Sequence, residues 1–303
     1  GGDAVQQPAQ PSVEYPLNTA ELDQDEQALQ QVLQSAKSQR VPTMTQLVDL
    51  IAINELLGTV ESSGDGKNAN LVAQLETESL ADKAAEFKTT NNDDTIGWIR
   101  IPNTNVDYPV VYKAGVENYA YYESKGYDKQ YSKDGVIWAD YECTFPELSQ
   151  NTTLYGHNWH NIYTPRTQAN MQANDLMFSL VMSYNYTDFA QENPFIYFST
   201  TEQDYVFQVF ASYYTDLNFG YNYAQMSQED FQKVIAEAKA KSLSNYNVPV
   251  TSEDKIVTLS TCTRVHGNTN NQRFVVMAKL VPVGTPSTTI STHSNPIAYN
   301  SSI

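Results

Sequence analysis

A change in hydrophobic period at Thr95 constrains the fold of this chain more than any other feature. Before it, apolar residues recur about every 3.6 positions, as on a helix face; after it they alternate, as on a strand. Eight segments rich in β-branched and aromatic residues follow, at 96–101, 106–112, 135–139, 152–155, 195–200, 205–214, 255–263 and 273–281. Eight strands at this spacing predict a closed or nearly closed β-barrel, so the expected fold is mainly β with peripheral helices.

Helical patterns lie before and between these strands. Upstream, apolar stripes predict helices at 19–38, at 47–57 and at 71–87. Within the strand region, residues 177–184 and 228–243 show the same period. The barrel is therefore expected to carry helices at its periphery, including a long one just before the strand at 255–263.

The chain divides into three parts by texture. Residues 1–65 form a Gln-rich helical appendage, residues 66–283 the main domain, and residues 284–303 lack any period and are expected to be a flexible tail. The appendage could be a spacer, a helical pack on the back of the barrel, or a lid over a cleft. The first two are favoured because the segment offers no nucleophile or metal ligand.

Charge and composition exclude several classes of protein. Eighteen Lys and Arg against 35 Asp and Glu give a net charge of −17, which disfavours binding to nucleic acid or to anionic membrane surfaces. Two Cys and four His are too few for a disulfide scaffold or a zinc finger, and no metal or other cofactor is expected. No apolar run is long enough to cross a bilayer, so any membrane anchor is expected before Gly1.

Cys262 is the residue best placed to act as a nucleophile. It ends the apolar run 256–261, where a buried strand emerges and its last side chain can face a cleft. A thiol needs a neighbouring base or cation to react at neutral pH. Arg273 begins the next strand across a turn-rich segment, so the two can face one another, and His157 follows another apolar strand at Gly156.

Three motifs around these residues resemble the sortase family. They are TLSTC at 258–262, LYGHN at 154–158 and RFVV at 273–276, in the family's order and at matching spacing. The helix at 228–243 and the opening segments GWIRIP and VDYPV are most similar to class B sortases. The resemblance covers about residues 70–283 and implies a closed eight-stranded barrel with a helix inserted before the cysteine strand.

The resemblance implies a cysteine transpeptidase. Cys262 would attack a Thr carbonyl in a C-terminal sorting signal, His157 would transfer protons, and Arg273 would hold the developing oxyanion. Ser260 and Thr261 are candidates for substrate contact near the thiolate, although both could be ordinary strand residues.

The same resemblance implies the partners and the location. The substrate would be a secreted protein with an Asn-Pro-x-Thr-x-like signal, and the acceptor an amine of a peptidoglycan cross-bridge or of a pilin subunit. The protein would act outside the membrane of a Gram-positive-type bacterium, and its Tyr-rich, charge-poor composition agrees with a bacterial surface protein. The sequence does not separate the two acceptors.

Four other residues compete for the catalytic roles. Cys143 lies in a loop-like stretch without partner motifs and is expected to be a packed thiol. His160 falls outside the GHN segment, His266 is expected to be solvated or to line the cleft, and Arg264 departs from the family's placement of the arginine. Two rival functions remain, a non-catalytic β-barrel adhesin with a Cys143–Cys262 disulfide and a cysteine hydrolase of similar geometry.

Overall fold

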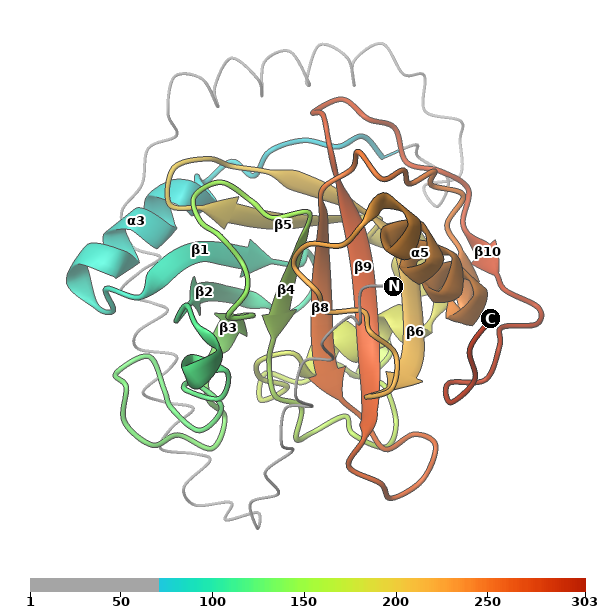
Figure 1. Ribbon diagram of the computed structural model, residues 1–303, viewed down its shortest axis with the longest axis horizontal. Helices are drawn as coiled ribbons and strands as arrows, with labels where there is room; N and C mark the ends of the chain where they lie inside the picture. Colours follow the sequence, from blue (N-terminus) through green and yellow to red (C-terminus); the bar gives the residue numbers. More distant parts are fainter. Residues whose placement is uncertain (1–70) are drawn as a thin grey trace.

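The computed structural model describes residues 71–303, in which eight strands close into a barrel. Their order around it is β1-β2-β3-β4-β8-β9-β6-β5 (Figure 1). The strands are β1 (Thr95–Arg100), β2 (Asp107–Val111), β3 (Ile137–Ala139), β4 (Asn151–Tyr155), β5 (Phe195–Thr200), β6 (Val206–Asp216), β8 (Ile256–Cys262) and β9 (Gln272–Val281). The predicted barrel and its eight strands are confirmed. The appendage at 1–65 and the helices at 19–38 and 47–57 lie outside the described residues.

Helices and a small second sheet surround the barrel. The α-helices are α3 (Leu80–Thr90), α4 (Thr187–Glu192) and α5 (Gln228–Lys241), and the 3₁₀ turns are η1 (Val116–Asn118), η2 (Gln168–Asn170) and η3 (Ser179–Asn185). Strands β7 (Ser244–Asn245) and β10 (Ser291–Thr292) pair antiparallel outside the barrel. The helix predicted at 228–243 is confirmed as α5, whereas the pattern at 177–184 forms the 3₁₀ segment η3.

Helix α3 begins later than its apolar pattern predicts. The helix expected from residue 71 starts at Leu80, because Ser79 caps it by accepting a hydrogen bond from Asp82 N. Asp204 also accepts from Ser79 Oγ and from Ala81 N, at 2.9 and 2.8 Å. Upstream, Ala73 exchanges backbone hydrogen bonds with the C-terminal segment instead of with a helix.

The C-terminal segment differs from the predicted flexible tail. Residues 284–303 form β10 and pack along α5, with Ile297 N donating to Ala240 O and Ile303 N to the Glu237 side chain. Figure 1 shows the C-terminus beside α5. The segment lacks a hydrophobic period because hydrogen bonds to other elements, rather than one apolar face, hold it in place.

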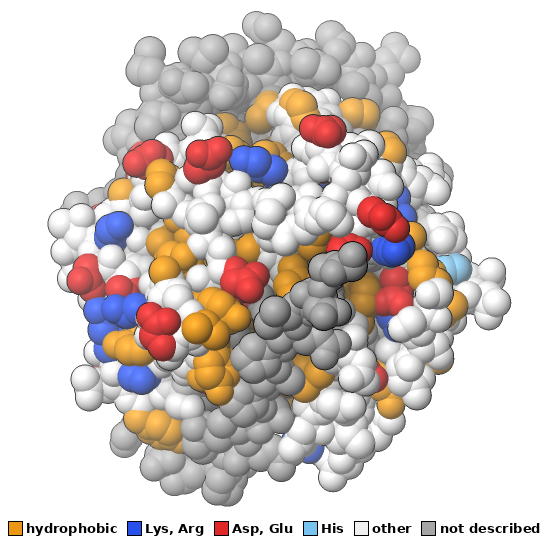
Figure 2. Space-filling model, in the orientation of Figure 1, with side chains coloured by type: hydrophobic (Ala, Val, Ile, Leu, Met, Phe, Trp, Pro, Cys, Tyr) orange, Lys and Arg blue, Asp and Glu red, His pale blue; other side chains and the backbone are white. Residues whose placement is uncertain are grey.

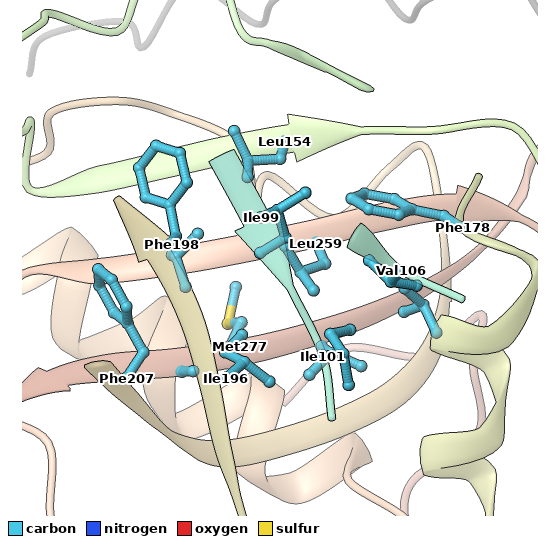
Figure 3. Packing of buried hydrophobic residues seen from close by; sticks show 14 of the residues in the cluster. Ile99, Ile101, Val106, Leu154, Phe178, Ile196, Phe198, Phe207, Leu259 and Met277 are labelled. Carbon is cyan, nitrogen blue, oxygen red and sulfur yellow. The ribbon is translucent and has the colours of Figure 1, made fainter. Parts of the chain in front are cut away.

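The barrel interior is filled by apolar side chains from every part of the barrel. Figure 3 shows Leu154, Ile99 and Leu259, from β4, β1 and β8, gathered in this core, and each is fully buried. Burial of one such side chain stabilises the fold by about 1.5–3 kcal/mol. Gly97 is required in this wall, because a Cβ there would collide with Ser199 O on the neighbouring β5.

Strand direction brings three chain ends together. Strand β4 runs parallel to β8, and β8 runs antiparallel to β9. The carboxyl ends of β4 and β8 therefore lie at the same end of the barrel as the start of β9. In the described residues no helix is long and apolar enough to cross a membrane.

The surface shown in Figure 2 carries acidic and basic side chains singly or in small groups, with no broad basic area on that face. Uncharged polar side chains and backbone make up most of the rest.

Candidate active site

Cys262 and Arg273 face one another across two neighbouring strands. They are directly paired in the antiparallel register of β8 and β9, at the end where both strands meet the loop 263–271. Cys262 is partly exposed, whereas Arg273 is 6% exposed. The predicted juxtaposition of these two residues is confirmed.

The guanidinium of Arg273 is oriented by backbone carbonyls. Its Nη1 donates to Asn270 O and to Gln272 O, both at 2.9 Å. Burial opposes its charge, but the negative charges that Cys262, Tyr221, Tyr155 and Glu123 carry when ionised outweigh burial and raise the pKa of Arg273. Arg273 therefore presents a fixed positive charge beside the thiol.

His157 follows the end of β4, the strand next to β8 in the barrel. The register of the two strands ends where Tyr155 of β4 pairs with Ser260 of β8, and His157 and Cys262 each follow two residues later. Cys262 belongs to β8, so its side chain lies on the same face as that of Ser260, whereas His157 lies beyond the last residue of β4. The segment that carries His157 and the strand that carries Cys262 thus end next to one another.

Three hydrogen bonds fasten the histidine segment to the cysteine strand. Gly156 N donates to Ser260 O at 3.3 Å, Thr261 Oγ1 donates to Gly156 O at 2.7 Å, and Asn158 Nδ2 donates to Cys262 O at 3.1 Å. A Cβ at Gly156 would lie 2.6 Å from Ile137 Cδ1. Glycine is therefore needed for the close packing that places His157 next to the thiol.

The imidazole of His157 is held in one tautomer. Its Nε2 lies 2.5 Å from Glu123 O. A carbonyl oxygen only accepts, so Nε2 carries the proton and, in the neutral ring, Nδ1 keeps the free lone pair. Trp159 stacks on the ring with centroids 5.5 Å apart, and Trp138 lies 5.7 Å away.

The surroundings of His157 keep it neutral. Burial lowers the pKa of His157, the hydrogen bond to Glu123 O opposes that shift, and the charge of Arg273 lowers the pKa further. At neutral pH the ring is therefore uncharged and able to accept a proton at Nδ1.

Ser260 and Thr261 are both 2% exposed and have partners inside the protein. Ser260 Oγ hydrogen-bonds Tyr221 OH at 2.7 Å, and Thr261 reaches Gly156 as described. The two hydroxyls thus connect the elements of the site. Their contact with substrate stays a prediction.

No pattern in the sequence predicted the buried polar network that lies beside the site. Tyr155 OH donates to Asp140 Oδ2 at 2.7 Å and accepts from Asn222 Nδ2 at 2.8 Å, and its ring lies 5.5 Å from that of Trp138. Asn222 and the neighbouring Tyr221 belong to the loop between β6 and α5 and carry no motif. Only the pairing of distant strands brings them to the thiol.

The competing residues lie elsewhere or are occupied. Arg264 donates to the side chains of Asn268 and Asn270 within its own loop, each at 2.7 Å. His266 stacks on Tyr299, and His160 lies in the loop after Asn158, beyond the segment bonded to β8. None of the three lies in the register that pairs Cys262 with Arg273 or in the segment around His157 that is bonded to β8.

The two cysteines are both free thiols. Cys143 is 2% exposed, and its Sγ lies 3.9 Å from Asn151 O. Burial raises the pKa of Cys143, which keeps it as an unreactive thiol. The structure therefore contradicts the disulfide on which the adhesin alternative rested.

Comparison with known proteins gives one consistent result. A family model described as Sortase domain matches residues 99–281. Sortase B of Staphylococcus aureus is 31% identical over 193 residues, which is 63% of this chain and 72% of that protein. Sortase B of Listeria monocytogenes is 29% identical over 191 residues, 63% of this chain and 71% of that protein.

Solved structures agree with these sequence matches. The Staphylococcus aureus sortase B–substrate complex superposes with a TM-score of 0.57 and 28% identity, covering 68% of this chain and 88% of that one. Clostridium perfringens sortase B gives a TM-score of 0.54 and 26% identity, covering 65% of this chain and 98% of that one. The matched family region includes Cys262, His157 and Arg273.

Proposed function

This chain belongs to the sortase family, within it to class B. We propose that it cleaves a C-terminal sorting signal after Thr and transfers the Thr acyl group to an amine. Sortases are cysteine transpeptidases, and Cys262, His157 and Arg273 are proposed as the residues that carry the reaction here. The observation that supports this proposal is the pairing of Cys262 with Arg273 in the register of β8 and β9, together with the hydrogen bonds that hold the segment of His157 against β8.

The first half of the reaction is acylation. His157 Nδ1 accepts the thiol proton, and the sulfur of Cys262 attacks the Thr carbonyl to form a tetrahedral intermediate. The intermediate collapses as the C–N bond breaks, and the proton on His157 passes to the leaving amine. The products are a thioester on Cys262 and a free C-terminal peptide.

The second half repeats these steps in reverse. An amine attacks the thioester carbonyl and loses its proton to His157. The C–S bond then breaks, an amide forms, and the thiol of Cys262 is regenerated. The proton that His157 takes from the incoming amine passes to the departing sulfur, so His157 accepts one proton and releases it in each half, and a neutral resting His157 suits both halves.

Arg273 is assigned to the oxyanion. Its fork lies opposite Cys262, and its carbonyl contacts hold it in place before the substrate arrives. A donor fixed beforehand gains strength as negative charge develops on the carbonyl oxygen. Removal of one such donor typically costs about 10²–10³-fold in turnover.

The test is incubation with a panel of sorting-signal peptides, including Asn-Pro-x-Thr sequences, with and without added amines, and analysis of products by mass. We expect cleavage after Thr. When an amine is added, we expect a product in which that amine is joined to the Thr carbonyl through an amide bond. Free acid under both conditions would favour a cysteine hydrolase. Absence of cleavage across the panel would contradict the enzyme assignment.

The acceptor is proposed to be an amine of a peptidoglycan cross-bridge or of a pilin subunit. A cross-bridge glycine peptide and a lysine-bearing pilin peptide, supplied in competition, separate these two, because the preferred one will dominate the products. We also propose a cell-surface location for this sortase, which protease treatment of intact cells followed by detection of the protein will test.

A further inference from the structure

The C-terminal strap, residues 285–303, extends from the end of the barrel along α5 to the loop beside the active site. Figure 1 shows the C-terminus beside α5, and the contacts given above join this segment to Ala240 and Glu237 of that helix. The strap also lies outside the region that matches the sortase domain. The match to the family therefore does not explain the role of the strap.

Lys241 anchors the far end of the strap. This lysine is 2% exposed, and its Nζ donates to Tyr299 O at 3.0 Å, to Ala298 O at 3.4 Å and to Ser301 O. The ammonium group thus has three carbonyl acceptors close together in the strap. Those contacts fix the backbone at Tyr299.

The side chain of Tyr299 packs on the β8–β9 loop, residues 263–271. Its ring stacks on His266 with centroids 4.5 Å apart and an interplanar angle of 12°. Tyr214 of β6 meets the same imidazole edge-on at 4.8 Å and 89°. His266 is held between a barrel residue and a strap residue.

From His266 a chain of hydrogen bonds reaches Arg273. His266 N donates to Gln272 Oε1 at 3.0 Å, and Gln272 Nε2 donates to Gly267 O at 2.7 Å and to Thr269 Oγ1 at 2.8 Å. The carbonyls of Gln272 and Asn270 are the ones that orient the Arg273 guanidinium. The loop conformation and the direction of the fork are thus linked.

We propose that Tyr299 is a positioning residue for the transpeptidation reaction, which acts through His266 to hold the β8–β9 loop in the conformation that aims Arg273 at the substrate carbonyl. This inference rests on the proposed role of Arg273. Val265 of this loop packs against the core, whereas residues 266–271 are exposed and turn through a left-handed Gly267, with φ of +118°. The ring stack on His266 adds a contact at this exposed part of the loop.

The first test compares Tyr299→Ala with Tyr299→Phe. The Ala variant loses the stack, and we expect kcat to fall about tenfold, part of the roughly 10²–10³-fold worth of one oxyanion donor, with KM and the thermal midpoint little changed. The Phe variant keeps the ring and should retain wild-type kcat. Tyr205→Ala, a partly exposed tyrosine at the opposite end of β6, is the matched control and should also retain it.

The second test places Tyr299→Ala in an Arg273→Lys background, with turnover followed by mass over hours. If Tyr299 acts through Arg273, the added substitution will cause no further loss, because the two residues then share one effect. His266→Ala, which removes the other ring, should reproduce the loss in kcat and should not add to Tyr299→Ala.

Wild-type kcat in Tyr299→Ala, or an equal fold-loss in the Arg273→Lys background, would overturn the positioning role and leave the sortase assignment intact. A wild-type protein that cleaves no sorting peptide would instead count against the proposed function. Full activity of Arg273→Lys would overturn both the role of Arg273 and the inference built on it.

Discussion

Arg100 and Arg273 lie at different parts of the barrel, the first partly exposed and the second buried, and their partners differ. Arg100, at the end of β1, donates to Glu76, Glu78 and Asp107 at 3.4, 3.3 and 3.0 Å. Arg273 is held by backbone carbonyls, which carry no formal charge. The charge of Arg100 is neutralised by carboxylates, whereas that of Arg273 stays available to a ligand.

This difference indicates that the region around Arg100 stabilises the fold, whereas the region around Arg273 is suited to binding a ligand. Around Arg100, Lys83 pairs with Glu78 at 3.0 Å and Trp98 Nε1 donates to Asp107 at 2.7 Å, so the cluster joins α3 and its leading segment to the barrel. Around Arg273, the neighbours are a thiol and a neutral imidazole. Substitutions at the first cluster should change stability, and those at the second should change turnover.

The largest effect is expected from the reacting groups themselves. Cys262→Ala and His157→Ala should each lower transpeptidation by more than about 10³-fold, since one removes the proposed nucleophile and the other the proposed proton carrier. Cys143→Ala is the matched thiol control and should stay close to wild type. Comparable loss in the Cys143 variant, measured by the same mass assay, would show that the reactive thiol had been misassigned.

A direct contrast between the arginines comes next. Arg273→Lys keeps the charge but loses the fork, so activity should fall about 10²-fold with the thermal midpoint unchanged. Arg100→Lys should do the opposite, lowering the free energy of unfolding by about 1–2 kcal/mol with activity preserved. Arg264→Lys should be mild, because the Arg264 guanidinium donates to Asn268 and Asn270 of its own loop and does not pair with Cys262 in the register of β8 and β9. The reverse ranking of Arg273 and Arg264 would show that the wrong arginine was chosen.

The two regions should also respond to acid at different pH. Since the pKa of His157 is lowered, its contribution to stability is present above the unfolded value of about 6.5 and is lost as pH falls from there through the folded pKa. Burial opposes it, but Arg100 and Trp98 lower the pKa of Asp107, so its contribution is lost only below about pH 4. Thermal midpoints of wild type and His157→Gln, compared between pH 4 and 8, should converge as pH falls. Parallel curves would contradict the lowered pKa.

The smallest effect is expected from the N-terminal appendage. Removal of residues 1–65 should leave peptide cleavage within about twofold of wild type, because that segment is predicted to supply no catalytic group. If it were a lid, cleavage and alkylation of Cys262 would rise together, since both need access to one thiol. Both rates are measured on the same preparation, so a joint severalfold rise would identify a regulatory segment.

Much of the barrel could be predicted because its strands carry a local signal. The alternation in β8 and β9 indicated both their existence and their turn, and hence the pairing of Cys262 with Arg273. The start of α3 was missed since residues 71–79 have helical spacing but bond to the C-terminal segment and Asp204. A hydrophobic period indicates one apolar face of an element. It carries no information about backbone hydrogen bonds to segments far along the chain.

The site was predictable to the same extent. His157, Cys262 and Arg273 lie in motifs next to strand ends, whereas Tyr221, Asn222 and Asp140 reach the site only through pairing of distant segments. The tautomer of His157 depends on Glu123 O, a backbone atom 34 residues away that no side-chain pattern reports. The strap was interpreted as a tail because its anchors are carbonyls, which every residue carries.

The parallel pairing of β4 with β8 has a consequence for how the enzyme comes into being. Thr261 and Gly156 are 105 residues apart in the chain, so this seam closes only after a long loop has been brought together. Contacts of such high sequence separation form slowly, and barrels rich in them fold more slowly than helical proteins. Until that seam closes, the β8–β9 hairpin can already place Arg273 opposite Cys262, but the segment that carries His157 is not yet beside the thiol. The proposed reaction needs all three residues, so it becomes possible only once the barrel is complete.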